Sequence, residues 1–183
     1  MPETENLSRK RTFCTVLRQL KSPQNVGMIV RSHAAFGGER IVFVGEQHPW
    51  DFKKRSQAFS RKLERQCEII YLADDEDFFA WCKQERFATV ALEICSPPVL
   101  LNVFAFPART ALIVGNEGAG LSQTFQERCE HVVTIPQFGL VASLNVAVAC
   151  SVAMYELRRD QYPAATIIGD EYQAQERDIT GAM

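Results

Sequence analysis

The chain has 183 residues, a formal net charge of −2 at pH 7, 46% hydrophobic residues and 23% charged residues. This composition is ordinary for one globular domain with a sizeable core, and it argues against an intrinsically disordered chain. The near-neutral balance excludes a global basic field that would draw the whole protein to nucleic acid, although a local basic patch would suffice. No apolar run reaches the ~20 residues of a membrane-spanning helix, so no such segment is expected.

Cysteine and histidine usage indicates a metal-free protein of the reducing cytoplasm. The six cysteines are Cys14, Cys67, Cys82, Cys95, Cys129 and Cys150. No two of them form a C-x-x-C pair and most lie in apolar stretches, which is typical of buried reduced thiols. The three histidines are not closely spaced, so no metal site is predicted. The start of the chain, Met1–Glu5, is polar and acidic, unlike a secretory signal peptide.

The first half of the chain is predicted to form strands with one helix between the first two. That helix is expected from Asn25 because apolar residues recur at helical spacing and Gly37-Gly38 ends the pattern. In chain order we expect a mobile lead at 1–10, a strand at 12–17, a turn at 21–24, this helix, a strand at 40–44, a polar and basic connection with some helical character at 46–66, and a strand at 67–72.

The second half continues the alternation of strands and helices. We expect a helix at 74–84, a strand at 87–92, a strand at 111–115, a helix at 121–129, a strand at 131–135, a helix at 143–159 and a polar, flexible tail at 161–183. Such alternation predicts an α/β protein with a mostly parallel sheet flanked by helices. We therefore expect a single domain at 11–160.

A glycine-bearing loop, Gly115–Gly120, follows a strongly apolar strand pattern. Loops at the carboxyl ends of parallel strands are where α/β proteins build ligand sites, and glycine lets backbone approach a ligand closely. The loop is not a phosphate loop, because no lysine follows Gly120, and its G-x-x-G-x-G spacing is not the dinucleotide fingerprint. A plain strand-to-helix turn remains an alternative. Glu117 within it could bind a ligand, orient another group or cap the following helix.

Two polar residues, Ser143 and Asn145, stand where an apolar helix pattern begins. This is an unusual position for polar side chains unless a ligand binds there. Arg31 is similarly isolated on the first helix, where it calls for a carboxylate or phosphate partner unless it is simply exposed. His33 lies on the apolar side and is interpreted as a satisfied core histidine. No spacing suggests a hydrolytic triad.

The strongest basic patch lies in the connection at 46–66. Its cations are Lys53, Lys54, Arg55, Arg61, Lys62 and Arg65, interleaved with Trp50, Phe52 and Phe59. Most charge runs are solvated faces, but aromatic residues among cations favour an RNA-contact surface. Both interpretations remain open at this point.

Three segments together resemble the motifs of the SpoU, or TrmH-type, RNA methyltransferases. They are Asn25–Arg31 (NVGMIVR) with Ala35–Gly37 (AFG), Gly115–Ser122 (GNEGAGLS), and Ile135–Ala149 with its central SLNVAVA. The resemblance spans about residues 12–158. Each motif alone is moderately specific, whereas all three in this order are very specific.

The resemblance implies a fold and an activity. The expected fold is an α/β sheet whose C-terminal part forms a deep trefoil knot, and the knot's loops are expected to hold S-adenosylmethionine. The implied reaction moves the cofactor's methyl group to a ribose 2′-hydroxyl of RNA, with tRNA the first expectation and rRNA the second. The expected protein is a homodimer with each active site near the interface, without the N-terminal RNA-binding domain of some members.

The resemblance also implies roles for particular residues. The expected catalytic residues are Arg31, Asn25, Glu117, Ser143 and Asn145, and the expected cofactor-contacting residues are Leu92, Glu93, Gly115, Asn116, Ile135 and Leu144. Arg31 is either the general base or a phosphate clamp. Because arginine stays protonated at neutral pH, we favour the clamp. Ala91–Ile94 (ALEI) departs from the small or threonine residues of some members, so this part of the cofactor pocket is expected to differ.

Two other functions share this fold. One is a non-catalytic module that binds S-adenosylmethionine or RNA, and the other is a methyltransferase of a related knotted family that modifies a base nitrogen. The presence of Asn25, Arg31, Glu117, Ser143 and Asn145 favours the enzyme over the module, and the pairing of Asn25 with Arg31 favours ribose over base. Cofactor binding separates a binder from a non-binder, whereas only turnover on RNA separates an enzyme from a binder.

Overall fold

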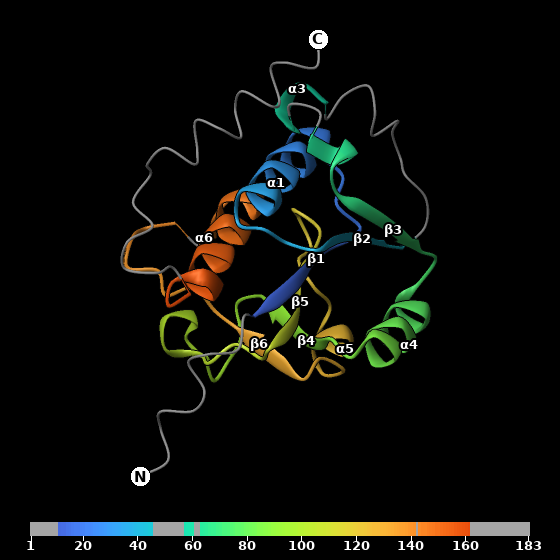
Figure 1. Cartoon of the computed structure of the whole chain (residues 1–183). Coiled ribbons are helices and arrows are strands. Elements are labelled where there is room, and N and C mark those ends of the chain that lie inside the picture. The colour runs from blue at the N-terminus through green and yellow to red at the C-terminus, as the bar shows by residue number, and fades with distance from the viewer. Residues whose placement is uncertain (1–10, 46–56, 61–62, 142, 162–183) are drawn as a thin grey trace.

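A computed structural model describes residues 11–45, 57–60, 63–141 and 143–161. The lead expected at 1–10 lies outside the described residues, as do most of the basic connection and the tail from residue 162. Figure 1 shows helices covering both faces of a central sheet. None of the helices in the described ranges is both long and apolar enough to cross a membrane.

The sheet has six strands in the order β3-β2-β1-β5-β4-β6, and each of its strand pairs is parallel. The strands are β1 (Thr12–Arg18), β2 (Arg40–Val44), β3 (Glu68–Leu72), β4 (Ala88–Leu92), β5 (Arg109–Val114) and β6 (His131–Val133). The predicted α/β class with a parallel sheet is confirmed. Because β4 lies between β5 and β6, the carboxyl ends of these three strands are neighbours, and polar loops from distant parts of the sequence meet there.

Helices flank the sheet on both sides. They are α1 (Pro23–Ala35), α3 (Gln57–Ser60), α4 (Asp75–Glu85), α5 (Gln123–Gln126) and α6 (Val146–Arg158), with 3-10 turns at Leu63–Arg65 and Leu101–Val103. In Figure 1, α1 and α6 lie side by side on one face, while α4 and α5 lie on the other. The helices expected near residues 25–36, 74–84, 121–129 and 143–159 are therefore present, with changed ends.

Alternation along the strands divides the core into two layers. In β1, Phe13 and Leu17 belong to the cluster under α1 and α6, while Cys14 and Val16 belong to the cluster under α4 and α5. Successive strand residues point to opposite faces, so each central strand feeds both layers. All six cysteines are free: Cys14, Cys82 and Cys150 are buried, and the others are partly buried.

Capping residues explain why two helices begin elsewhere than expected. α1 begins at Pro23, two residues before Asn25, because the Ser22 side chain caps it and proline suits the first helical position. α6 begins at Val146 rather than at residue 143, because Asn145 accepts hydrogen bonds from the Ala147 and Val148 amides. Ser143 and Leu144 therefore lie in the loop before α6.

The helix expected at 121–129 is much shorter in the structure. α5 ends at Gln126, and the Arg128 and Cys129 amides bond three residues back, in tight turns rather than a continuing α-helix. Glu130 and Thr89 then exchange side-chain to backbone hydrogen bonds of 2.9 and 3.2 Å. This pairing fixes the chain to β4, where β6 begins.

Arg158 connects the C-terminal ends of α1 and α6, the two helices that lie side by side on one face of the sheet. Its buried guanidinium donates hydrogen bonds to the carbonyls of Phe36 (2.9 Å), Gly37 (2.8 Å) and Arg11. The first two carbonyls follow the end of α1, and a cation is favourable at a helix C-terminus. α1 and α6 are thereby held together at the end farthest from their N-terminal caps.

His33 is the most completely buried ionisable ring of the α1 face. Its Nδ1 lies 2.8 Å from the Thr15 hydroxyl, its ring packs edge-on against Phe13, and Gly38 leaves room for it. Its Nε2 is buried without a partner in the described structure, so the predicted core position holds although only one nitrogen is satisfied. Burial lowers the pKa of His33 from 6.5 to about 4.

We predict that His33 makes the fold acid-sensitive. Its neutral form stabilises the protein fully above pH 6.5, and this stability is lost as the pH falls toward 4, because only the unfolded chain takes up the proton there. A pKa that falls from 6.5 to about 4 corresponds to about 3 kcal/mol. Urea unfolding at several pH values should show this loss in the wild type and a flatter profile in His33→Phe. Equal slopes in both proteins would refute the assignment.

Candidate active site

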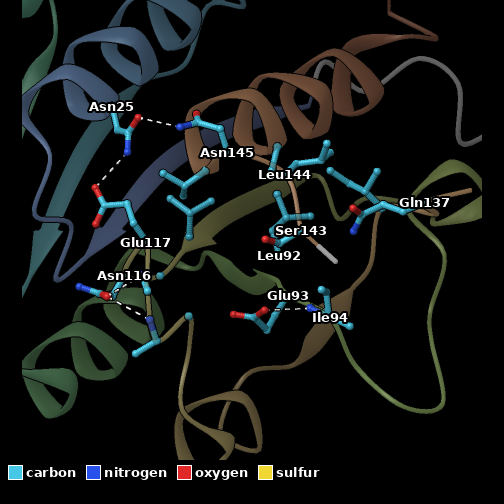
Figure 2. A pocket seen from close by; sticks show the side chains of 18 residues that line it. Asn25, Leu92, Glu93, Ile94, Asn116, Glu117, Gln137, Ser143, Leu144 and Asn145 are labelled. Atoms are coloured by element: carbon cyan, nitrogen blue, oxygen red, sulfur yellow. Dashed lines mark hydrogen bonds between the residues drawn. The ribbon is translucent and has the colours of Figure 1, made fainter. Parts of the chain in front are cut away.

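A cavity of about 490 Å³ opens at the carboxyl edge of the sheet. Its walls come from the ends of β4 and β5, the loop after β6, and the N-terminal turns of α1 and α6, as Figure 2 shows. The volume falls in the usual range for small-molecule sites, about 300–1,000 Å³. The position is also the one expected for ligands in open parallel sheets.

The cavity gathers most of the residues that the sequence singled out. The predicted residues that line it are Asn25, Leu92, Glu93, Gly115, Asn116, Glu117, Ile135, Ser143, Leu144 and Asn145. Sequence reasoning did not select Ile94, Val114, Gln137, Val146 and Ala149, which also line it. The sequence signal that could have identified two of them is their position: Ile94 directly follows the predicted Glu93, and Gln137 lies within the third motif.

Glu117 joins the loop after β5 to the start of α1. Its Oε1 accepts hydrogen bonds from the Ser22 amide (2.8 Å) and the Asn25 side chain (3.1 Å), and its Oε2 accepts one from the Lys21 amide (2.9 Å). Burial alone would raise the pKa of Glu117, but these donors hold it below its usual value. Of the three roles left open for Glu117, orienting another group fits this arrangement, because α5 is capped instead by Ser122.

Asn25 and Asn145 extend this connection to α6. Asn25 Oδ1 accepts a hydrogen bond of 3.0 Å from Asn145 Nδ2. The direction of each hydrogen bond in this series is determined at both ends, since the Glu117 carboxylate can only accept hydrogen bonds and the α6 amides can only donate them. The Asn25 amide must turn its NH₂ to Glu117, and Asn145 must turn its oxygen to α6. A single set of hydrogen bonds thus links β5, α1 and α6.

Asn116 shapes the glycine loop rather than facing the cavity with free groups. Its Oδ1 accepts hydrogen bonds from the amides of Gly118 (2.9 Å) and Ala119 (3.1 Å), and its Nδ2 donates to the Gln19 carbonyl (2.9 Å). A Cβ at Gly115 would lie 2.5 Å from the Gly120 backbone, so the two ends of the loop meet there. Glycine is required at 115 for this close approach.

Glu93 reaches across the edge of the sheet from the residue after β4. Its Oε2 accepts a hydrogen bond of 2.8 Å from the Leu121 amide, and its Oε1 accepts one of 3.0 Å from the Ile94 amide. Its own amide and carbonyl bond to Val133 and Thr134 beside it. Glu93 is therefore held in place by its own neighbour Ile94, by the end of the glycine loop and by the end of β6.

The charge within the cavity is negative. Among the described residues that line it, Glu93 and Glu117 are the only ionisable ones, and none is lysine, arginine or histidine. Ser143 and Gln137 make no hydrogen bond to any part of the described chain, so their polar groups are available to a ligand. No cluster of His, Cys, Asp and Glu suited to a metal ion occurs within the described ranges.

Arg31 is not brought to this cavity. It lies exposed on α1 and makes no hydrogen bond or ion pair with the described residues. The described residues of the same chain therefore do not supply the carboxylate that the sequence suggested as a partner for Arg31. The predicted RNA-contact residues Lys53, Lys54, Arg55, Arg61 and Lys62 lie outside the described residues.

We predict that Asn25→Asp destabilises the protein much more than Asn145→Asp. The first change removes a donor and places a carboxylate against Glu117, which should cost about 3 kcal/mol at pH 7. The second keeps the acceptor that caps α6 and places a favourable charge at a helix N-terminus, so its cost should stay near 1 kcal/mol. Urea unfolding measures both, and equal losses would contradict the hydrogen-bond directions given above.

The fold and the site define a class of protein, namely a parallel α/β protein with a small-molecule pocket built from the loops after β4, β5 and β6. Residues 12–155 match the model of the SpoU rRNA Methylase family, and the chain belongs to that family. The resemblance drawn from the three sequence motifs is thereby confirmed.

Relatives of this chain include proteins with named reactions. It is 36% identical over 157 residues to an uncharacterised tRNA/rRNA methyltransferase of Synechocystis, covering 82% of this chain and 54% of that one. It is 29% identical over 150 residues to the 23S rRNA (guanosine-2′-O-)-methyltransferase RlmB of Coxiella burnetii, covering 80% and 58%. The chain thus spans little more than half the length of these relatives.

A solved structure shares the fold. The SpoU methyltransferase AviRb of Streptomyces viridochromogenes, in complex with AdoMet, superposes with a TM-score of 0.75 at 26% identity. The similarity covers 84% of this chain and 62% of AviRb.

Proposed function

We propose that this chain is an S-adenosylmethionine-dependent methyltransferase that acts on a ribose 2′-hydroxyl of RNA. The observation that carries the proposal is the linked set of Glu117, Asn25 and Asn145 beside a cavity of about 490 Å³. Family membership and a relative named as a guanosine-2′-O-methyltransferase support it. Such a protein works where tRNA and rRNA are found, in the cytoplasm.

The residues of the cavity fit S-adenosylmethionine. Leu92, Ile135 and Leu144 offer apolar walls to an adenine ring, and the Gly115–Gly120 loop offers backbone groups. The two carboxylates suit a ligand that carries a sulfonium and an ammonium. AviRb, which shares the fold, holds AdoMet. When bound, the cofactor supplies an activated methyl group, so the protein has to align the ribose hydroxyl and manage its proton.

We assign Glu117 and Asn145 to positioning rather than to proton abstraction. Glu117 already accepts three hydrogen bonds and its pKa is lowered, which makes it a weak base. Ser143 differs, because its hydroxyl is uncommitted within the described structure and faces the cavity. Ser143 is therefore assigned to contact the reacting ribose, and Arg31 to clamp a neighbouring phosphate through its two-pronged guanidinium. Alignment of this kind can lower a barrier substantially.

Arg31 lies on an exposed face that suits a second copy of the chain. On α1, Met28, Arg31 and Ala35 recur at helical spacing, and all three are exposed. On the adjacent α6, Val148, Val152 and Tyr155 form an exposed apolar stripe. A monomer rarely leaves such a stripe uncovered. We therefore propose a homodimer through α1 and α6, in which Arg31 of one protomer completes the cavity of the other.

We also propose that the chain is knotted at this site. Thr134, after β6, exchanges backbone hydrogen bonds with Val99 and Leu101, which belong to the connection between β4 and β5. The chain then crosses the ends of β4 and β5 to reach α6 beside α1. This path suits a segment threaded through the loops that line the cavity. We also propose the domain limits of 11–160, which enclose the sheet and the helices that flank it.

For the substrate, tRNA remains the first proposal and rRNA the second. The basic residues Lys53, Lys54, Arg55, Arg61 and Lys62 are proposed as the RNA-contact surface. A base-nitrogen reaction and a non-catalytic role are not favoured by any group in the cavity.

We predict that the protein with S-adenosylmethionine restores a 2′-O-methylnucleoside to RNA from a strain lacking its gene. Mass mapping of nuclease digests identifies the nucleotide. Arg31→Lys keeps the charge but loses the two-pronged contact, so turnover should fall about 10²-fold while cofactor affinity stays within about twofold. Full activity in Arg31→Lys would contradict the phosphate clamp, and methylation of a base alone would contradict the reaction.

We predict that Val152→Glu converts the dimer to a monomer, because it places charge in the apolar stripe. Ala80→Glu is the matched control, since Ala80 is exposed on α4 across the sheet. Sedimentation should show a monomer for the first variant only. Co-expression of Arg31→Ala with Ser143→Ala should restore activity, because each mixed dimer contains one complete site. Absence of rescue in a proven mixed dimer would place Arg31 in its own chain's site.

A further inference from the structure

The polar side chains of the cavity divide into committed and available groups. Asn25, Asn116, Glu117 and Asn145 use their polar atoms to hold loops and helix ends together. Ser143 and Gln137 are uncommitted within the described structure, but they are neutral. Glu93 is the remaining one, and it combines a charge with unused acceptor capacity. A carboxylate offers about four acceptor positions, and Glu93 uses two.

The Glu93 carboxylate is fixed before any ligand arrives. The amides of Leu121 (2.8 Å) and Ile94 (3.0 Å) each hold one oxygen. A Cβ at Gly120 would lie 2.4 Å from Oε2, so the glycine leaves the space that the carboxylate occupies. Figure 2 shows this side chain among the residues that line the cavity, with its carboxylate directed toward the side of Asn116. A rigid acceptor pair binds a ligand without the cost of ordering a side chain.

A fixed carboxylate with two free acceptor positions matches a pair of neighbouring hydroxyl donors. Acidic residues near strand ends bind ribose hydroxyls in this way in dinucleotide folds. Apolar Leu92 and Ile94 flank Glu93 and suit a base, whereas Glu117, Asn25 and Asn145 lie at another part of the cavity. The surroundings of Glu93 thus fit the nucleoside part of a ligand better than its reacting end.

We propose that Glu93 binds the 2′- and 3′-hydroxyls of the cofactor's ribose, a role that rests on the proposed use of S-adenosylmethionine. The same side chain braces Gly120 and Leu121, so cofactor binding and the shape of the glycine loop depend on one carboxylate. The position coincides with the segment Ala91–Ile94, where the sequence departs from some members of the family.

The test is calorimetric binding of S-adenosylhomocysteine and of its 2′-deoxy and 3′-deoxy analogues to the full chain. Wild-type protein should bind each deoxy analogue about tenfold more weakly, as expected for loss of a charge-assisted hydrogen bond. In Glu93→Gln the parent compound should bind at least about tenfold more weakly, and the discrimination should shrink to within about threefold. Glu127→Gln, which makes the same change of charge at an exposed position that does not line the cavity, should retain the affinity and the full discrimination.

Comparison of ligands on one variant separates recognition from bracing. Unchanged discrimination in Glu93→Gln would overturn the proposal, because Glu93 would then only support the loop. Weaker binding of S-adenosylmethionine with unaltered binding of S-adenosylhomocysteine would also overturn it, in favour of a charge effect on the sulfonium. If Glu93→Gln does not fold, Glu93→Asp carries the same test, since its shorter carboxylate cannot reach both hydroxyls. Wild-type protein that binds none of the ligands would overturn the proposed function itself.

Discussion

The carboxylate of Glu117 is the interaction on which the site depends. It lies in the loop after β5 and binds the backbone just before α1, together with the Asn25 side chain. Through Asn25 and Asn145 the connection continues to the first amides of α6. Three elements far apart in the sequence are thereby fixed at one edge of the sheet. Asn25 is the buried member of this set, and its side-chain oxygen and nitrogen both have partners within the protein, without help from a ligand.

This arrangement explains how a cavity persists among elements that could otherwise pack together. Strand ends and helix starts carry unpaired backbone groups, and the side chains that satisfy them also keep the loops apart. Asn116 and Gly115 hold the glycine loop closed on itself, while Glu93 ties that loop to β4. Few lining side chains keep unused polar atoms within the described structure: Glu93 has spare acceptor positions, and Ser143 and Gln137 make no hydrogen bond there.

Much of the architecture could be predicted from local patterns. Alternating strand and helix patterns predicted the parallel α/β class. The ends of elements were less predictable, because they depend on partners. α6 begins at Val146 since Asn145 caps it, and α5 stops after Gln126 since the chain then pairs with Thr89. The part that Glu117 plays was left open among three alternatives because its partners lie more than 90 residues away.

By itself, the sequence determined the class of fold, the family and most residues of the cavity, since hydrophobic periodicity and short motifs are local properties of the chain. Only the tertiary structure decided which of those residues bond to one another and which keep unused polar atoms. Glu117, Asn25 and Asn145 are linked by hydrogen bonds, whereas Glu93 and Ser143 keep polar atoms that a ligand can use. Arg31 lies on an exposed face away from its own cavity. These outcomes depend on strand order and on which polar groups meet in space, and no spacing along the chain records either.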